Sequence, residues 1–183
     1  MSAPLLIGLT GYAGTGKDTV REILESSGFC GFAFADPIRN MVRELLASTG
    51  IDECWMARRE LKEEAIPQLG VSYRELAQTL GTEWGRRLQP DFWLRIANAY
   101  VADLTYQGAS ALVVSDVRFA NEAAWVRQRG GVIWRIHREL AGRVREHVSE
   151  SELDGIKPDV TLHNDGTVAD LSRTVCEALR NRV

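Results

Sequence analysis

A glycine-rich turn that ends in a lysine follows the first apolar run of the chain, in the stretch LLIGLTGYAGTGKDTV at residues 5–20. Three glycines, Gly11, Gly14 and Gly16, let the backbone bend so that successive amides point inward at an anion. Lys17 adds a positive charge, and the helical pattern after it offers N-terminal amides to the same anion. The spacing matches the phosphate-binding loop GxxxxGK(S/T) at every position except the last. The alternative is an ordinary strand-to-helix turn.

Two aspartates are candidates for a magnesium site. Asp18 stands where the motif has Ser or Thr, and Thr19 comes one residue later. Asp116 ends the apolar run ALVVSD, a pattern that places a carboxylate beside such a loop. Carboxylates bind Mg²⁺ directly or through water, so Asp18 acts on the metal and its water shell or holds the loop. For Asp116 the alternative is a helix or turn cap. Val117 follows it instead of a second acid, which disfavours an ATP-driven motor.

Charged side chains also follow these apolar runs. Arg118 comes two residues after Asp116, where it can clamp a phosphate through two hydrogen bonds; the alternative is a surface ion pair. Asp36 follows the second apolar run, in FADPIR, and can accept a hydrogen bond from a sugar hydroxyl or a base. Arg39, one helical turn later, can meet a phosphate. A capping role for Asp36, before a helix that begins at Pro37, is a compatible alternative.

The stretch QTLGTEWGRRLQPDFWLR, residues 78–95, combines two Trp and one Phe with three Arg. Aromatic rings beside arginines suit stacking on a base and holding its phosphate. For most of these positions we favour the simpler interpretation, two amphipathic helices with core Trp residues. From this stretch we expect Gln78, Arg86 and Trp93 to reach a substrate.

A second basic stretch, RIHRELAGRVREHVSESE at residues 135–152, has little apolar periodicity. Its arginines are Arg135, Arg138, Arg143 and Arg145. A basic lid of this kind can fold over two phosphorylated ligands, neutralise a transferring group and exclude water. A solvated charged helix is the alternative. His137, His147 and His163 have no zinc-ligand spacing to another ligand.

Five apolar runs have the character of buried parallel strands, and helical patterns alternate with them. The runs are Leu5–Leu9, Cys30–Phe34, Ala111–Ser115, Val132–Ile136 and Val160–His163. The helical patterns are Lys17–Ser26, Pro37–Ser48, Tyr73–Leu88 with a capping box of Ser72 and Glu75, Asp91–Tyr106, Asn121–Arg129, and a last helix after Thr167. The order predicts a parallel α/β sheet with helices on both faces, whose ligands sit beyond the carboxyl ends of the strands.

The overall composition fits one globular domain. The chain has 183 residues, 45% hydrophobic and 26% charged, and a net charge of −3 gives no reason to expect a nucleic acid polymer as partner. Its three cysteines are scattered, and the N-terminal apolar run is too short for a signal or a membrane span. We therefore expect a cytoplasmic protein that binds no membrane. Five Trp are compatible with an apolar homodimer interface but do not require one.

Taken together, these motifs resemble the deoxynucleoside monophosphate kinases of bacteriophage and prophage origin, within the nucleoside monophosphate kinase group of P-loop proteins. The matching pieces are LTGYAGTGKDTV, FADPIR, LGTEWGRRLQPDFW, VVSDVRFANEAAWVRQRGGVIWRI, EHVSE and VTLHNDGT, in order over most of the chain. The GKD in place of GK(S/T) is itself a trait of that family. The resemblance implies transfer of the ATP γ-phosphate to a deoxynucleoside monophosphate with Mg²⁺. It also implies a three-layer P-loop fold with a five-stranded parallel sheet and an arginine-rich lid.

Carried over to this sequence, the resemblance assigns roles along a single kinase domain of residues 1–183. ATP would be held by Gly11, Ala13, Gly14, Thr15, Gly16, Lys17, Asp18 and Thr19. Acceptor-binding helices would lie at approximately 36–95, with Phe34, Asp36, Arg39, Gln78, Arg86 and Trp93 at the acceptor. The catalytic residues would be Lys17, Asp116, Arg118 and Arg138, the last in a lid at approximately 138–152. Mg²⁺ would be held by Asp18 and Asp116, directly or through water.

Two other functions remain open from the sequence. A kinase acting on dephospho-coenzyme A shares the phosphate-binding loop and an Asp after the second strand, but typically carries Ser after the Lys and lacks the VRFANE and GTEW stretches. A non-catalytic ATP-binding module that regulates a partner is the second alternative, although it leaves the arginine-rich stretch unexplained.

Overall fold

Five parallel strands form the sheet of the computed structural model, which describes residues 4–139 and 152–181. In chain order they are β1 (Leu5–Thr10), β2 (Cys30–Phe32), β3 (Ala111–Val114), β4 (Val132–His137) and β5 (Val160–His163), and their order in the sheet is β2-β3-β1-β4-β5. The central strand β1 pairs with β3 and with β4, so that Ile7 lies between Val113 and Val132. All pairings are parallel, as the apolar runs predict.

The chain divides into two compact units, Met1–Ala33 with Asn98–Val183, and Phe34–Ala97. The first unit holds the sheet. The second coincides closely with the stretch 36–95 in which we expect the acceptor-binding helices. That the whole of residues 1–183 acts as one kinase domain stays a prediction.

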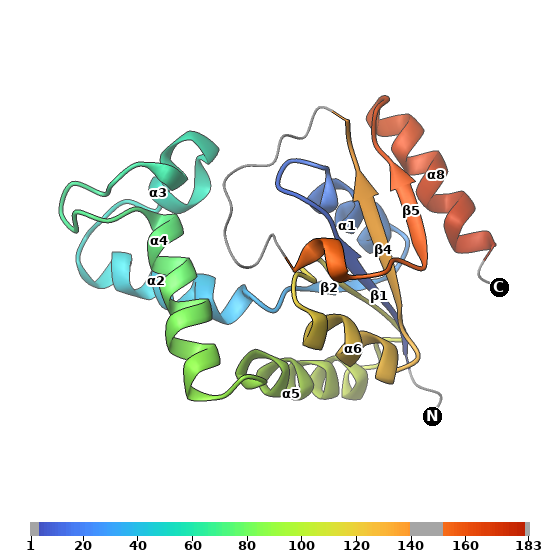
Figure 1. The fold of residues 1–183 in the computed structure, drawn as a ribbon, viewed down its shortest axis with the longest axis horizontal. Coiled ribbons are helices and arrows are strands. Elements are labelled where there is room, and N and C mark those ends of the chain that lie inside the picture. The colour runs from blue at the N-terminus through green and yellow to red at the C-terminus, as the bar shows by residue number, and fades with distance from the viewer. Residues whose placement is uncertain (1–3, 140–151, 182–183) are drawn as a thin grey trace. The chain divides into compact units, whose positions relative to one another are not determined.

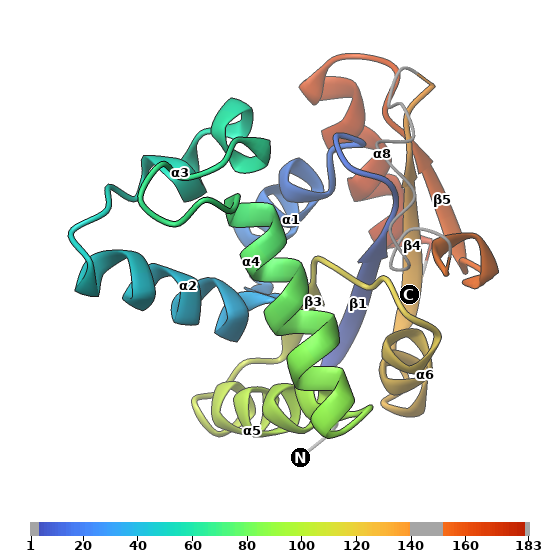
Figure 2. The ribbon, with the colours of Figure 1, turned by 60° about the vertical axis from the view of Figure 1, so that its left-hand side comes forward.

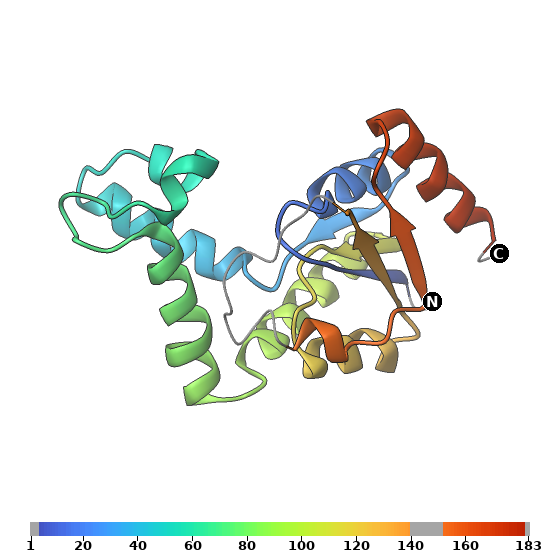
Figure 3. The same ribbon diagram turned by 45° about the horizontal axis from the view of Figure 1, so that its top comes forward.

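Helices cover both faces of the sheet in the first unit. One face carries α1 (Lys17–Ser26) and α8 (Val168–Arg180), which Figure 3 shows on one side of the strands, with α6 (Ala120–Gln128) on the other. Val20 and Leu24 of α1 share a buried core with Leu171 and Val175 of α8. On the opposite face, Phe32 contacts Tyr100 of α5 (Phe92–Tyr106) and Trp125 of α6. These contacts make the three layers that the alternating pattern predicts (Figure 1).

The second strand ends earlier than its sequence indicates. We predicted Cys30–Phe34, but β2 stops at Phe32, whose carbonyl accepts the amide of Ser115 at 3.0 Å. Phe34 already belongs to the second unit, where it is buried. Helix α2 then begins at Asp36 rather than Pro37, so only three residues separate strand and helix.

The second unit is helical. It holds α2 (Asp36–Ser48), α3 (Cys54–Ala57), the 3₁₀ helix η1 (Arg59–Glu63), α4 (Tyr73–Gln78), the π-helical segment η2 (Thr79–Arg86) and the start of α5. Its core is a cluster of buried residues, Val42, Leu46, Ile51 and Ile66. The predicted capping box is present: Ser72 Oγ accepts the amide of Glu75 at 3.2 Å, and Glu75 Oε2 accepts the amide of Ser72 at 2.8 Å.

The helix predicted over Tyr73–Leu88 is continuous but is not α-helical throughout. Figure 2 shows α4 running on as one green helix, and its second part, η2, is wound as a π-helix. The indole Nε1 of Trp93 donates to the carbonyl of Gly81 at 2.7 Å, which takes that carbonyl as a partner from outside the helix. Insertion of a side chain into the helical ladder is a recognised cause of such widened turns.

No helix within residues 4–139 and 152–181 combines the length and the apolar character that a membrane crossing requires.

Candidate active site

The glycine-rich turn lies between β1 and α1, where the sequence places it. Gly11, Gly14 and Gly16 all have positive φ, at 143°, 79° and 100°. A Cβ on Gly11 would overlap the carbonyl oxygen of Ile136, so the bend leaves no space for a side chain there. Gly16 is the residue before the first turn of α1, and because it has no side chain it cannot cap the helix amides. The turn is therefore an open bend that leads directly into a helix N-terminus, the arrangement that binds phosphate.

Lys17 folds back over this turn. Its Nζ donates to the carbonyl of Gly11 at 2.6 Å and to that of Tyr12 at 2.8 Å. Thr15, which is buried, donates its hydroxyl to the same Tyr12 carbonyl at 2.9 Å. These bonds hold the ammonium group against the loop, within reach of a phosphate that the loop binds. Ala13 and Thr19 are half-buried, whereas Asp18 is exposed in the first turn of α1.

Asp116 follows β3, the strand that pairs with β1, so it lies at the same edge of the sheet as the phosphate-binding loop. Asp116 is buried, with only 8% of its surface exposed. The next amide, of Val117, donates to the carbonyl of Leu9 at 3.0 Å and ties this segment to β1. Asp116 is not the N-cap of α6, because that helix begins at Ala120 and Phe119 precedes it. The helix-cap half of the alternative is therefore wrong, and the turn-cap half stays a prediction.

The backbone of Arg118 is fixed by Glu122, a residue that we did not predict at the site. Glu122 is 3% exposed, and its Oε2 accepts the amides of Arg118 at 2.7 Å and Phe119 at 3.1 Å. A buried carboxylate is stable only when such donors satisfy it. The local signal was present in VRFANE, where Glu122 is the third residue of α6 and can reach back to the amides before the helix.

A second missed residue is Asn164, just after β5. Its Nδ2 donates to the carbonyl of Thr15 in the phosphate-binding loop at 2.8 Å. Its own amide donates to the carbonyl of His137 at 2.8 Å. The sequence offers only a weak signal for this contact, a polar residue at the carboxyl end of a strand.

Comparison with known proteins identifies the family. The model of the deoxynucleotide monophosphate kinase family matches residues 52–175. A relative named a putative deoxynucleotide monophosphate kinase, from Acanthamoeba polyphaga mimivirus, is 30% identical over 97% of this chain and 97% of its own. The chain belongs to the deoxynucleotide monophosphate kinase family. The predicted family is confirmed, and so is the predicted enzyme class, a nucleotide phosphotransferase built on a phosphate-binding loop that uses ATP.

Solved structures support the fold of this deoxynucleotide monophosphate kinase family member. TT1252 from Thermus thermophilus has a TM-score of 0.56 at 18% identity, covering 98% of each chain. A gluconokinase from Sinorhizobium meliloti has a TM-score of 0.51 at 15% identity, covering 99% of this chain and 94% of that one. At these identities the likeness concerns the fold alone. It agrees with the predicted α/β fold around a five-stranded parallel sheet.

The arginine-rich stretch of this family member is described only at its two ends. Residues 140–151, with Arg143, Arg145 and His147, lie outside the described residues. Arg138 is exposed directly after β4.

Arg135 belongs to β4, within the strand predicted over Val132–Ile136 and before the lid expected at approximately 138–152. Its Nη2 donates to the carbonyls of Leu153 at 2.8 Å and Ile156 at 2.5 Å. The guanidinium group therefore anchors the segment that leads into β5.

The residues expected at the acceptor all lie in the second unit of the kinase. Asp36 and Arg39 form an ion pair at 2.7 Å in the first turn of α2. Ala35 precedes that turn and no side-chain cap is made there, so Asp36 is not the capping residue. A Cβ on Gly81 would lie 3.0 Å from Ile38 Cδ1, which places η2 against the same end of α2.

Gln78 and Arg86 flank the Gly81 contact along the helix and are both half-buried. Trp93 differs from them, because it is 4% exposed and its indole N–H is bonded to Gly81. The structure therefore gives Trp93 a packing role, the simpler of the two interpretations. Contact between Trp93 and a substrate stays a prediction, as do the contacts of Phe34, Gln78 and Arg86.

Proposed function

We propose that the phosphate-binding loop, residues 11–19, holds the triphosphate of ATP, and that the protein transfers its γ-phosphate to a deoxynucleoside monophosphate. The products are ADP and a deoxynucleoside diphosphate. The observation that carries this proposal is the loop itself. Three positive-φ glycines form an open bend between β1 and α1, and Lys17 lies against it. Membership of the deoxynucleotide monophosphate kinase family supplies the acceptor class.

The chemical step needs positioning more than covalent help. An oxygen of the acceptor's phosphate attacks the γ-phosphorus in line and forms the new P–O bond. The bond from the γ-phosphorus to the oxygen that bridges it to the β-phosphorus breaks, and its electron pair leaves with ADP. Lys17, Arg118 and Arg138 then act by holding the two phosphates together and neutralising their charge.

Asp18 and Asp116 are the residues we propose for Mg²⁺. Within the described residues no group of three or more His, Cys, Asp or Glu side chains could hold a metal ion by itself. Mg²⁺ in kinases needs no such group, because one or two carboxylates act together with water and substrate phosphates. The two aspartates suit that chemistry. When bound, the ion would neutralise charge on the β- and γ-phosphates.

The second unit, Phe34–Ala97, is the part we propose for the acceptor. The Asp36–Arg39 pair at the start of α2 offers one carboxylate and one guanidinium group, each about two-fifths exposed. The guanidinium group suits the acceptor's phosphate and the carboxylate suits a hydroxyl or a base edge. Gln78 and Arg86, on the helix that packs against this end of α2, add an amide and a second guanidinium group.

An acceptor panel tests the proposed reaction. Purified protein with ATP and Mg²⁺ is incubated with each deoxynucleoside monophosphate, each ribonucleoside monophosphate and dephospho-coenzyme A, and ADP formation is measured. We expect turnover with one or more deoxynucleoside monophosphates. Phosphorylation of dephospho-coenzyme A alone would contradict the proposal, and ATP binding without transfer to any acceptor would favour a regulatory module.

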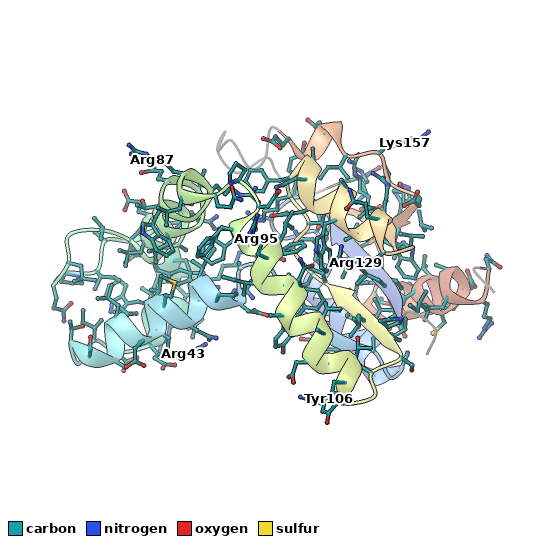
Figure 4. The ribbon with its side chains drawn as sticks, turned by 90° about the horizontal axis from the view of Figure 1, so that it is seen from below. Arg43, Arg87, Arg95, Tyr106, Arg129 and Lys157 are labelled. Atoms are coloured by element: carbon teal, nitrogen blue, oxygen red, sulfur yellow. The ribbon has the colours of Figure 1, made fainter. Side chains whose placement is uncertain are left out.

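Lys17→Ala tests the loop within that reaction. We expect turnover to fall by roughly 10³-fold, the scale typical of such charged groups at a transferring phosphate. Lys157→Ala is the matched control, since its exposed side chain points outward in Figure 4. A folded Lys17→Ala protein with near-normal turnover would refute the role of the loop.

Two expectations from the sequence stay predictions. A homodimer would have twice the chain mass of 20.4 kDa, which light scattering measures directly. Cytoplasmic location requires imaging or fractionation of the native host.

A further inference from the structure

Asn164 connects the loop after β5 with the phosphate-binding loop, 149 residues away in the sequence. We propose that Asn164 is a positioning residue, which holds the Thr15–Gly16 peptide in the orientation that presents the Gly16 amide to a bound phosphate. This proposal rests on the proposed binding of ATP phosphates by that loop.

Asn164 is held once through its side chain and once through its backbone. Its Nδ2 donates to the Thr15 carbonyl at 2.8 Å, and its backbone amide donates to the His137 carbonyl at 2.8 Å, at the end of β4. Asn164 is half-buried, and it directly follows β5, whose last rung pairs His137 with His163. The donor is therefore carried by the rigid edge of the sheet and not by a free surface chain.

The orientation of one peptide group follows from this bond. In a trans peptide the carbonyl and the next amide point in opposite directions. The structure holds no cis peptide bond in the residues it describes. Because the Thr15 carbonyl points at Asn164, the N–H of Gly16 points away from Asn164, on the opposite side of the same peptide plane.

The flexibility of Gly16 is the reason that the Thr15–Gly16 peptide needs a hydrogen bond to hold it. Glycine populates positive and negative φ about equally, so the peptide before it can rotate at little intrinsic cost. Gly16 has a φ of 100°, and a Cβ there would overlap the side-chain nitrogen Nδ2 of Asn164. The close approach of Asn164 thus requires glycine at position 16, and the conformational freedom of that glycine in turn requires a partner that holds the peptide.

Asn164 could instead contact the nucleoside of ATP directly. Binding of inorganic tripolyphosphate distinguishes this role from positioning of the loop. Tripolyphosphate carries the phosphates of ATP without a base or a sugar. If Asn164 acts through the loop, its loss weakens the binding of ATP and of tripolyphosphate by the same factor. If it acts on the nucleoside, tripolyphosphate binding does not change.

The test measures dissociation constants for both ligands by calorimetry, together with KM and kcat. We expect Asn164→Ala to weaken both ligands by roughly threefold to tenfold, the value of one lost hydrogen bond. We expect KM for ATP to rise by the same factor with kcat nearly unchanged, because saturating ATP restores the loop. Asn164→Leu, which keeps the volume but lacks the donor, should behave in the same way.

Asn98→Ala is the matched control. Asn98 also makes a long-range side-chain bond, accepting from Trp125 Nε1 at 2.7 Å, but between α5 and α6. It should lower the melting temperature without changing either dissociation constant. Unchanged binding in both Asn164 variants, or weakened ATP with unchanged tripolyphosphate, would overturn the inference alone. If the wild-type protein binds neither ligand, the proposed function fails, and the inference with it.

Discussion

Gly16 occupies a backbone conformation that residues with a side chain rarely adopt. Its φ is 100°, and a Cβ on Gly16 would also overlap the side-chain Nδ2 of Asn164. We expect Gly16→Ala to weaken ATP binding by roughly fivefold to a hundredfold, since such backbone strain costs about 1–3 kcal/mol. Calorimetry with ATP measures the effect.

Gly28→Ala is the control for backbone strain at Gly16. Gly28 has a similar φ of 93°, but a Cβ there would meet nothing within 4 Å. Both substitutions should lower the stability of the protein, and only Gly16→Ala should weaken the binding of ATP. Equal ATP affinities in the two variants would show that the loop tolerates a side chain at position 16.

Like Asn164, Glu122 is a residue to which we assign a positioning role. Its carboxylate satisfies the amides of Arg118 and Phe119 while almost fully buried. We expect Glu122→Ala to lose about 1–3 kcal/mol of stability, because two amides lose their partner. We also expect kcat to fall by about tenfold as Arg118 loses its fixed position.

Glu122→Gln distinguishes positioning of Arg118 from folding alone. The amide oxygen of Gln can still accept one or both backbone bonds, so kcat should recover in part. Urea unfolding and steady-state kinetics on both variants provide the comparison. A Glu122→Ala protein with wild-type kcat would show that the Arg118 backbone does not need this support.

The sequence revealed the phosphate-binding loop but not the residues that hold it. Glycines and a lysine at fixed spacing report a local backbone requirement, which one sequence displays. The pairing of β4 with β5 brings Asn164 to a partner 149 residues away, so a polar residue at the end of a strand is only a weak local signal for the contact. Arg135 belongs to the basic stretch 135–152 by its charge, but the strand predicted over Val132–Ile136 contains it, and the register of β4 places it opposite Thr10.

At the scale of elements, η2 and Trp93 are fitted to one another. A Cβ on Gly85 would lie 2.5 Å from Trp93 Cζ2 and 2.7 Å from Cε2, so the ring leaves no room for a side chain. Gly→Ala inside a helix normally stabilises it by about 0.5–1 kcal/mol. Here we expect Gly85→Ala to destabilise the protein by about 1–3 kcal/mol through overpacking.

Gly81→Ala provides the matched comparison within the same helix. Its Cβ would lie 3.0 Å from Ile38 Cδ1, the end of a flexible side chain that can move. Gly81→Ala should therefore be much milder, or even neutral. Urea unfolding of both variants measures the difference, and a stabilised Gly85→Ala protein would contradict the packing described for Trp93.

The strands and most helices of this chain could be predicted because their pattern is nearly continuous. Buried parallel strands are apolar on both faces, which marks each run without reference to its neighbours. The widened turn of η2 was not predictable in that way. It accompanies an indole from another helix that takes the Gly81 carbonyl. No element is predicted between Ser48 and Ser72, and that stretch holds only the short helices α3 and η1.

At the scale of the whole molecule, the proposed roles divide along the two units. All residues proposed for ATP and metal belong to the first unit, and all those proposed for the acceptor belong to Phe34–Ala97. Each unit also has its own capping box, Ser72 with Glu75 in the second and Thr167 with Asp170 in the first. These boxes give each unit a separate response to acid.

The amide of Ser72, followed by its hydroxyl, donates to Glu75 and lowers the pKa of that carboxyl below its ordinary 4.5. The Thr167 hydroxyl and amide likewise lower the pKa of Asp170 below 3.8. Each carboxylate therefore binds its proton more weakly in the folded state than in the unfolded state. Its contribution to stability is complete above the unfolded pKa and is lost as pH falls through the lower, folded pKa.

We therefore expect Glu75→Gln and Asp170→Asn to lower the urea midpoint by a constant amount between pH 7 and pH 5. Below pH 4.5 for Glu75, and below 3.8 for Asp170, the difference from wild type should shrink, because the wild-type carboxyl becomes protonated as well. The double variant should lose both contributions, since the two boxes lie in different units and do not share partners. Differences that stay constant down to pH 3 would show that these carboxyls do not ionise more readily in the folded protein.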